Sequence, residues 1–232
     1  MRFPEGAAHG FFTLSDVASG EKIAHGELVQ WLEKRVVARR LLIRFDDGSL
    51  YDETVRFTQR PAFRLASYEL TQKGPAFDQE QRVTFDASGR YEVRQQAPGE
   101  DEQRASGTTD VPDDVANGLT SVLAKNLRSG TEADVHLLAF RPEPLVLDLS
   151  IRPEGRDPYW VGDARSEATR FVVEPEVPGV KGLLASIVGK EPPTVRLWIA
   201  PEPAPGLVRF EGALFVDGPP WRMDLAAPRW TK

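Results

Sequence analysis

Apolar and polar residues alternate along most of this chain with a period of two, which is typical of β-strands that bury one face. The clearest run covers 145–151, where leucine or isoleucine occupies every second position. The segment 51–58 alternates in the same way, with Tyr51, Val55 and Phe57 on its apolar face. Such strands bury one face and leave the other in water, as antiparallel sheets commonly do.

Turn signals divide these runs into short strands. Asp46-Asp47-Gly48-Ser49 and the segment 86–90 predict hairpin turns, because glycine supplies the positive φ that such turns need. Further strands are predicted at 9–14, 27–45, 63–71, 195–199, 207–216 and 221–225. Ten or more strands exceed the usual sheet, so we expect a large curved antiparallel sheet that forms an open, half or closed barrel.

One helix is predicted over 111–129, inserted between the strands. Pro112 suits a first helical turn, and apolar residues recur at helical spacing between Val115 and Leu127. Gly118 inside this segment suggests close approach to a neighbouring element. A shorter helix is predicted at 180–188, and the polar segment 95–109 is interpreted as a hairpin extension or loop. The expected architecture is one mainly β domain over 1–232, with one or two helices on the concave face.

Composition excludes several functions. The chain has 232 residues, a formal charge of −6 and no cysteine, which rules out thiol catalysis, disulfides and metal–thiolate centres. The acidic balance argues against nucleic-acid binding. A basic cluster, Arg35, Arg39, Arg40 and Arg44, is interpreted as the solvated face of a strand.

The sequence also gives expectations about the cellular compartment of the protein. The longest apolar run is far shorter than the roughly 20 residues of a membrane helix, so no transmembrane segment is expected. The residues after Met1 lack a signal-peptide pattern. We therefore expect a periplasmic or secreted location if a leader was removed, and a cytoplasmic one otherwise.

Local catalytic motifs are absent. His9, His25 and His136 are widely spaced, so neither a metal site nor a cofactor is expected. The acidic residues around 46–53 are interpreted as turn chemistry, and no serine-nucleophile or phosphate-loop signature is found. A hydrolase with a spatially assembled site stays open as an alternative, and it predicts a histidine within hydrogen-bond reach of a carboxylate.

Aromatic residues are spread over nearly every predicted strand. In a curled sheet they can line an apolar cavity, because barrels of about eight or more strands can hold a ligand. Four of them near strand centres are candidate ligand-binding residues: Trp31, Tyr68, Phe77 and Trp198. Core packing is the competing interpretation for each of the four.

Several segments resemble a family of uncharacterised, mostly exported bacterial proteins. The resemblance is carried by the segments 68–77, 111–119, 190–199 and 210–222. The last third is also distantly similar to the open half-barrel of periplasmic lipoprotein carriers. That similarity implies a curved sheet with helices on its concave face and an apolar ligand site, and it implies no catalytic residues.

The leading hypothesis is therefore a non-enzymatic, envelope-associated binding protein for a lipid-like or other hydrophobic ligand. The alternative is a structural or protein-interaction module of the bacterial envelope that meets a protein partner through a sheet edge or the proline-rich loop 201–205. The first hypothesis requires a cavity of ligand size, about 300 Å³ or more.

Overall fold

The computed structural model describes residues 1–161, 163–176, 194–201, 205–215 and 218–226. Its strands are β1 (Ala8–Asp16), β2 (Lys22–Glu33), β3 (Val36–Phe45), β4 (Leu50–Thr58), β5 (Arg64–Lys73), β6 (Glu80–Asp86), β7 (Arg90–Gln96), β8 (Gln103–Thr108), β9 (Ala133–Phe140), β10 (Pro144–Val161), β11 (Ala164–Glu176), β12 (Val195–Ile199), β13 (Leu207–Gly212) and β14 (Trp221–Leu225). One helix, α1, covers Thr120–Asn126. The prediction of a mainly β protein is confirmed.

All fourteen strands belong to one antiparallel sheet, in the order β8-β7-β6-β5-β4-β3-β2-β1-β14-β13-β12-β11-β10-β9. Strands that follow one another in the sequence are hydrogen-bonded neighbours, except that β8 and β9 lie at opposite edges. The two halves of the chain meet where β1 pairs with β14. The hairpin turns predicted at 46–49 and 86–90 connect β3 to β4 and β6 to β7, and the segment 95–109 contains the β7–β8 hairpin.

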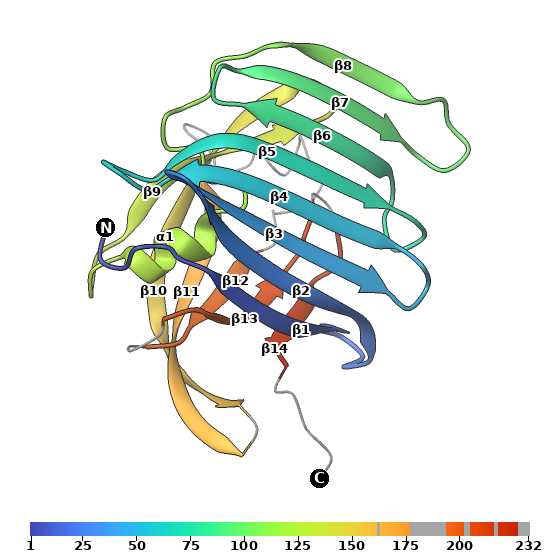
Figure 1. Ribbon diagram of the computed structural model, residues 1–232. Coiled ribbons are helices and arrows are strands. Elements are labelled where there is room, and N and C mark those ends of the chain that lie inside the picture. The colour runs from blue at the N-terminus through green and yellow to red at the C-terminus, as the bar shows by residue number, and fades with distance from the viewer. Residues whose placement is uncertain (162, 177–193, 202–204, 216–217, 227–232) are drawn as a thin grey trace.

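The sheet curls strongly, so that its two edges approach each other (Figure 1). Phe140 in edge strand β9 lies 5.7 Å from Phe85 and 5.9 Å from Tyr91, measured between ring centroids. The Gln95 side chain donates a hydrogen bond of 2.9 Å to the Phe140 carbonyl. These contacts are made by side chains, and no ladder joins β8 to β9. The sheet is therefore open, and the closed barrel, one of the predicted forms, is not present.

The segment before α1 occupies the free edge of β9. Ala116 donates its backbone N–H to the His136 carbonyl at 2.7 Å. The buried Asn117 side chain donates to the Leu138 carbonyl and accepts from the Leu138 N–H, both at 2.9 Å. An unpaired edge strand exposes backbone groups to a further strand. Here these groups are satisfied from within the chain, which explains why β9 stops the sheet.

The structure places a helix only at 120–126 within the predicted range 111–129. Two features stop helical hydrogen bonding before Thr120: the bonds of Ala116 and Asn117 to β9, and the positive φ of +68° at Gly118. Val115 and Leu119 do pack in the core, but the residues before Thr120 form turns on either side of an isolated bridge between Val115 and His136. The second helix predicted at 180–188 lies outside the described residues.

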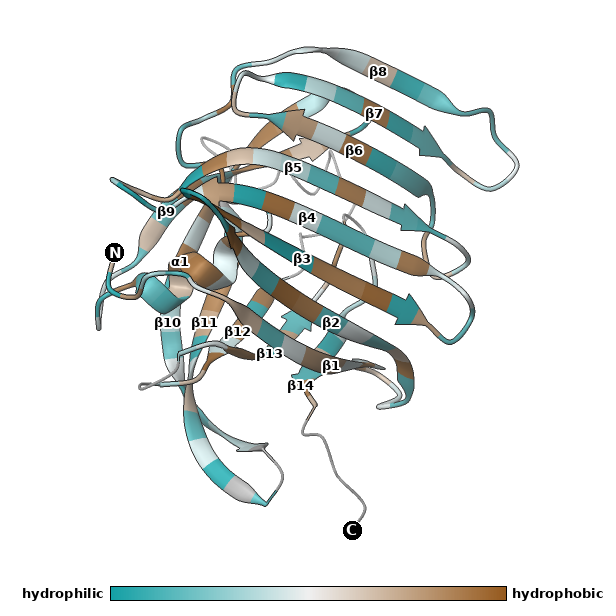
Figure 2. Cartoon of the chain, viewed as in Figure 1, coloured by the Kyte–Doolittle hydropathy of each residue, from teal (hydrophilic) through white to brown (hydrophobic). Residues whose placement is uncertain are grey.

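Three apolar clusters fill the concave side of the sheet. The first joins β3–β7 to β9 and contains Val115, Leu119 and Val122 from the segment around α1. The second joins β1–β4 to β14, and Phe77 and Trp221 meet edge to face within it. The third packs α1 against β9–β12. Apolar stripes along β2–β5 are visible in Figure 2.

Charged pairs across neighbouring strands cover much of the convex face. Arg40 binds Asp52 through two hydrogen bonds of 2.8 and 2.6 Å. Arg56 binds Glu69 at 3.0 Å. Opposite charges on facing strands stabilise a sheet modestly and keep its outer surface soluble.

Gly118 offers a test of how tightly the segment 115–119 fits. A Cβ added there would lie 3.1 Å from Val55 Cγ1, whereas one added at Gly130, which also has positive φ, meets nothing within 4 Å. We expect Gly130→Ala to lower the free energy of unfolding by about 1–2 kcal/mol, the cost of the left-handed conformation. Gly118→Ala should cost about 1–3 kcal/mol more because of overpacking. Urea denaturation of both variants measures this difference, and equal losses would contradict the proposed close fit.

Candidate functional site

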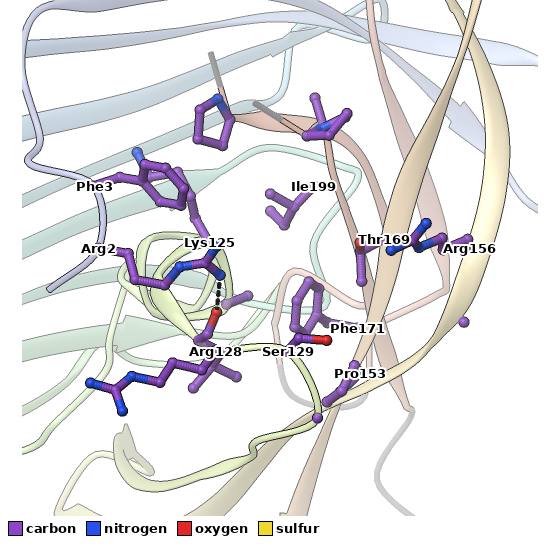
Figure 3. A pocket seen from close by; sticks show the side chains of 17 residues that line it. Arg2, Phe3, Lys125, Arg128, Ser129, Pro153, Arg156, Thr169, Phe171 and Ile199 are labelled. Carbon is purple, nitrogen blue, oxygen red and sulfur yellow. Dashed lines mark hydrogen bonds between the residues drawn. The ribbon is translucent and has the colours of Figure 1, made fainter. Parts of the chain in front are cut away.

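A cleft of about 530 Å³ opens beside the C-terminal end of α1, between the helix and strands β10–β12 (Figure 3). Phe171 and Ile199, which project from the concave faces of β11 and β12, form its apolar floor. Phe3, Leu127, Pro201 and Pro205 add further apolar surface. Ser129 and Thr169 are the hydroxyl groups in the lining. The volume lies in the range of about 300–1,000 Å³ that is common for small-molecule pockets.

The N-terminal segment forms one wall of the cleft and is held there by side-chain hydrogen bonds. Asn126 at the end of α1 accepts from the backbone N–H groups of Arg2 and Phe3, both at 2.8 Å. Further along, Gln59 bonds both backbone groups of Glu5, at 2.7 and 3.1 Å. These contacts fix Phe3 over the cleft although it lies outside any strand or helix.

Among the described residues that line the cleft, every charged one is cationic: Arg2, Lys125, Arg128 and Arg156. The Arg2 guanidinium donates to the Leu127 carbonyl at 2.7 Å, as Figure 3 shows. Lys125 Nζ lies 2.5 Å from the buried Glu5 Oε1, so its charge is compensated. The guanidinium groups of Arg128 and Arg156 form no hydrogen bond or ion pair with any residue that the structure describes, although the Arg128 carbonyl accepts hydrogen bonds from Thr131. The rim is therefore basic, although the protein as a whole carries a formal charge of −6.

A second group of polar residues lies deep in the concave face, on β3, β4 and β5. Glu53 Oε1 accepts hydrogen bonds from the hydroxyls of Tyr68, at 2.8 Å, and Tyr51, at 3.3 Å. Arg39 lies on the same face, because it pairs directly with Val55, two residues from Glu53. Its guanidinium makes no hydrogen bond to a described residue and interacts electrostatically with Glu53 and Glu5.

Burial shifts the pKa values of this group. Desolvation raises the pKa of Glu53, although hydrogen bonds from the tyrosines and the charge of Arg39 act in the opposite direction. Burial also lowers the pKa of Arg39, while the nearby carboxylates raise it. Lys125, Glu5, Arg39 and Glu53 thus form a row of alternating charges beneath the segment around α1. Paired charges are the usual condition for keeping ionised groups inside a protein.

The interpretation of the arginine cluster as a solvated strand face is wrong for Arg39. Arg40 and Arg44 lie on the convex face, whereas Arg39 faces the interior. Consecutive residues of a strand point to opposite faces, so the pair Arg39-Arg40 could not be solvated on one side. The same rule separates Asp52, paired with Arg40, from the inward Glu53. The alternation of faces along β3 and β4 could therefore have predicted that Arg39 and Glu53 face the interior.

The predicted ligand residues do not form one site. Tyr68 and Phe77 face the concave interior but belong to different apolar clusters. Trp31 pairs with Ala38 on the convex side and bonds Glu33 at 2.7 Å. Trp198 also faces outward, where its Nε1 bonds Asp157 at 2.7 Å. None of the four lines the cleft, which is assembled from segments too distant in sequence for local patterns to predict.

Two histidines meet carboxylates, as the hydrolase alternative predicts. The exposed His9 Nε2 lies 3.2 Å from Glu27 Oε2, and His136 contacts two carboxylates. His136 Nδ1 lies 2.6 Å from Asp114 and its Nε2 lies 3.2 Å from Asp148. A histidine that serves as general base needs one ring nitrogen for the nucleophile, and here a carboxylate contacts each. The arrangement ties the segment before α1 to β9 and β10. Within the described ranges, no group of three or more potential ligands could hold a metal ion.

No family model, no curated protein and no solved structure matches this chain. The resemblance to exported bacterial proteins therefore stays a prediction. Within the part of the chain that the structure describes, no helix has the length and apolar character needed to cross a membrane.

The raised pKa of Glu53 predicts a pH-dependent stability. The folded protein keeps the Glu53 proton to higher pH than the unfolded chain, so its contribution to stability is lost as pH rises from 4.5, the ordinary pKa of a glutamate, through the raised pKa. Glu53→Gln cannot titrate, so its free energy of unfolding, relative to wild type, should rise over this interval. Urea denaturation at several pH values between about 4.5 and 8 measures the difference.

Tyr68→Phe provides the matched variant for this test. It removes a hydrogen bond that lowers the pKa of Glu53. The interval in which stability depends on Glu53 should then extend to higher pH. Parallel pH profiles for wild type and Glu53→Gln would contradict the assignment.

Proposed function

We propose that this protein binds a hydrophobic, lipid-like small molecule in the cleft beside α1 and is not an enzyme. The observation that carries the proposal is a cleft of about 530 Å³ whose floor is apolar, at Phe171 and Ile199. Pockets of this size that combine apolar walls with a few polar groups are typical ligand sites. The carboxylate contacts at both nitrogens of His136 favour binding over hydrolysis.

An envelope location is part of this proposal and rests on the resemblance of the sequence segments alone. Co-purifying molecules provide a first test. Native mass spectrometry and organic extraction of the protein from its own cells should recover an apolar compound. Determining the compartment by cell fractionation tests the location separately.

A blocking substitution tests whether the cleft is the ligand site. Thr169 lines the cleft next to Ile199, with which it pairs, so a tryptophan at position 169 should fill the space without adding charge. We expect Thr169→Trp to weaken binding of the uncharged dye Nile red by at least about tenfold, a loss of about 1.4 kcal/mol. Fluorescence titration measures the affinity.

Thr54→Trp is the matched control, because Thr54 lies on the convex face opposite Arg40. It should change the affinity for Nile red by less than about twofold, since a surface substitution away from the site contributes little. Unchanged dye binding by Thr169→Trp, in a variant that stays folded, would contradict the proposed site.

A protein-interaction module is the second candidate function, and the β10–β11 hairpin favours it. Beyond the positions where β9 and β12 pair with it, this hairpin extends from the sheet without a third strand (Figure 1). Trp160 near its tip is 57% exposed, and the Arg165 guanidinium lies 5.9 Å from its ring. Tryptophan and arginine are enriched among residues that dominate protein interfaces.

Trp160→Ala separates the two functions. If the hairpin binds a protein, the variant should lose a partner that co-purifies with wild type from the native organism, and its affinity for Nile red should stay unchanged. Quantitative mass spectrometry of the purified complexes measures the loss. Equal recovery of all partners with wild type and variant would count against the hairpin.

A further inference from the structure

We infer that the cleft selects an amphipathic anion, a single acyl chain that ends in a carboxylate or a phosphate. This inference rests on the proposed function and adds the chemical class of the ligand's head group. It starts from the charges of the described residues that line the cleft: four side chains are cationic and none is acidic. Because the rest of the protein is acidic overall, this local excess of positive charge sets the cleft apart.

The four cationic side chains differ in the contacts that they already make within the protein. Lys125 is held by Glu5 at 2.5 Å, and the Arg2 guanidinium bonds the Leu127 carbonyl. Arg128 and Arg156 are exposed, and their guanidinium groups form no hydrogen bond or ion pair with the residues that the structure describes. Long arginine side chains can lie along apolar surface while the guanidinium turns toward a partner. These two residues are therefore the ones that we assign to the head group.

Their positions flank the apolar floor. Figure 3 shows Arg128 on the side of α1 and Arg156 on the side of β10, with Phe171 and Ile199 between them. A chain packed on this floor would place its charged end at the rim, within the field of both arginines. Guanidinium groups bind carboxylates and phosphates through two parallel hydrogen bonds, a geometry that an ammonium group does not provide.

The volume limits the apolar part of the ligand. A cleft of about 530 Å³ lies in the lower half of the range for small-molecule sites, which favours one acyl chain over the two chains of a phospholipid. The opening toward solvent lets a charged end stay hydrated, so the ligand need not bury its charge. Burial of an unpaired charge would oppose binding.

A series of ligands with one chain length and different ends tests the inference. Dodecanoate, dodecyl phosphate, 1-dodecanol and dodecylammonium are titrated against the full chain below their aggregation concentrations, with displacement of Nile red as the readout. We expect both anions to bind at least about tenfold more tightly than the alcohol, and the cation to bind most weakly. Comparing the two anions distinguishes a fatty-acid head group from a phosphate.

Substitution of the two arginines tests their roles. In the double variant Arg128→Gln/Arg156→Gln, the advantage of dodecanoate over dodecanol should fall below about threefold, while the affinity for dodecanol stays within about twofold of wild type. Arg90→Gln, on β7 and paired with Asp86, is the matched control and should keep the full advantage. Raising the salt concentration should reduce the advantage in wild type, because salt screens exposed charges.

The outcomes separate this inference from the proposed function. If neither Nile red nor dodecanol binds, the proposed function fails. If dodecanol binds as tightly as the anions, or if the double variant keeps the advantage, the head-group assignment is overturned and the hydrophobic site stands. Preference for the anions that disappears in the double variant supports both.

Discussion

The outer edge of β9, which has no further strand beside it, is the constraint on which the rest of the structure depends. A sheet of fourteen strands must end somewhere, and an open edge recruits other strands. Here Asn117 satisfies both backbone groups of Leu138, and Ala116 bonds His136. Because those residues directly precede α1, ending the sheet also brings the helix into its concave face. The same contacts therefore protect the edge of the sheet and hold α1 in the core.

The cleft follows from the same placement. A helix of only seven residues covers part of the concave face, and it leaves a cleft beside its C-terminal end that Phe171 and Ile199 line. The N-terminal segment completes the wall, since Asn126 bonds Arg2 and Phe3. The site is thus built where three distant parts of the chain meet, and its shape depends on the helix staying where β9 holds it.

Much of the fold was predictable from local patterns, and the site was not. Alternation at 51–58 and 145–151 identified strands correctly. Gly48 and Gly89 marked the β3–β4 and β6–β7 turns. The helix over 111–129 was predicted too long because apolar spacing does not reveal that Asn117 bonds a distant strand. Alternation could have placed Arg39 in the interior. No sequence pattern places Phe3 and Phe171 in one cleft, because the cleft exists only after the sheet has curled.

The pairing of β1 with β14 has a consequence for the order of events during synthesis. Strand β1 can bond β2 as soon as both leave the ribosome, but its other edge finds its partner only when residues 221–225 have been made. Contacts between such distant segments form slowly, because a long loop must close first. This pairing, near the centre of the sheet, must therefore wait for residues 221–225, and the nascent chain carries an open β1 edge until those residues have been translated.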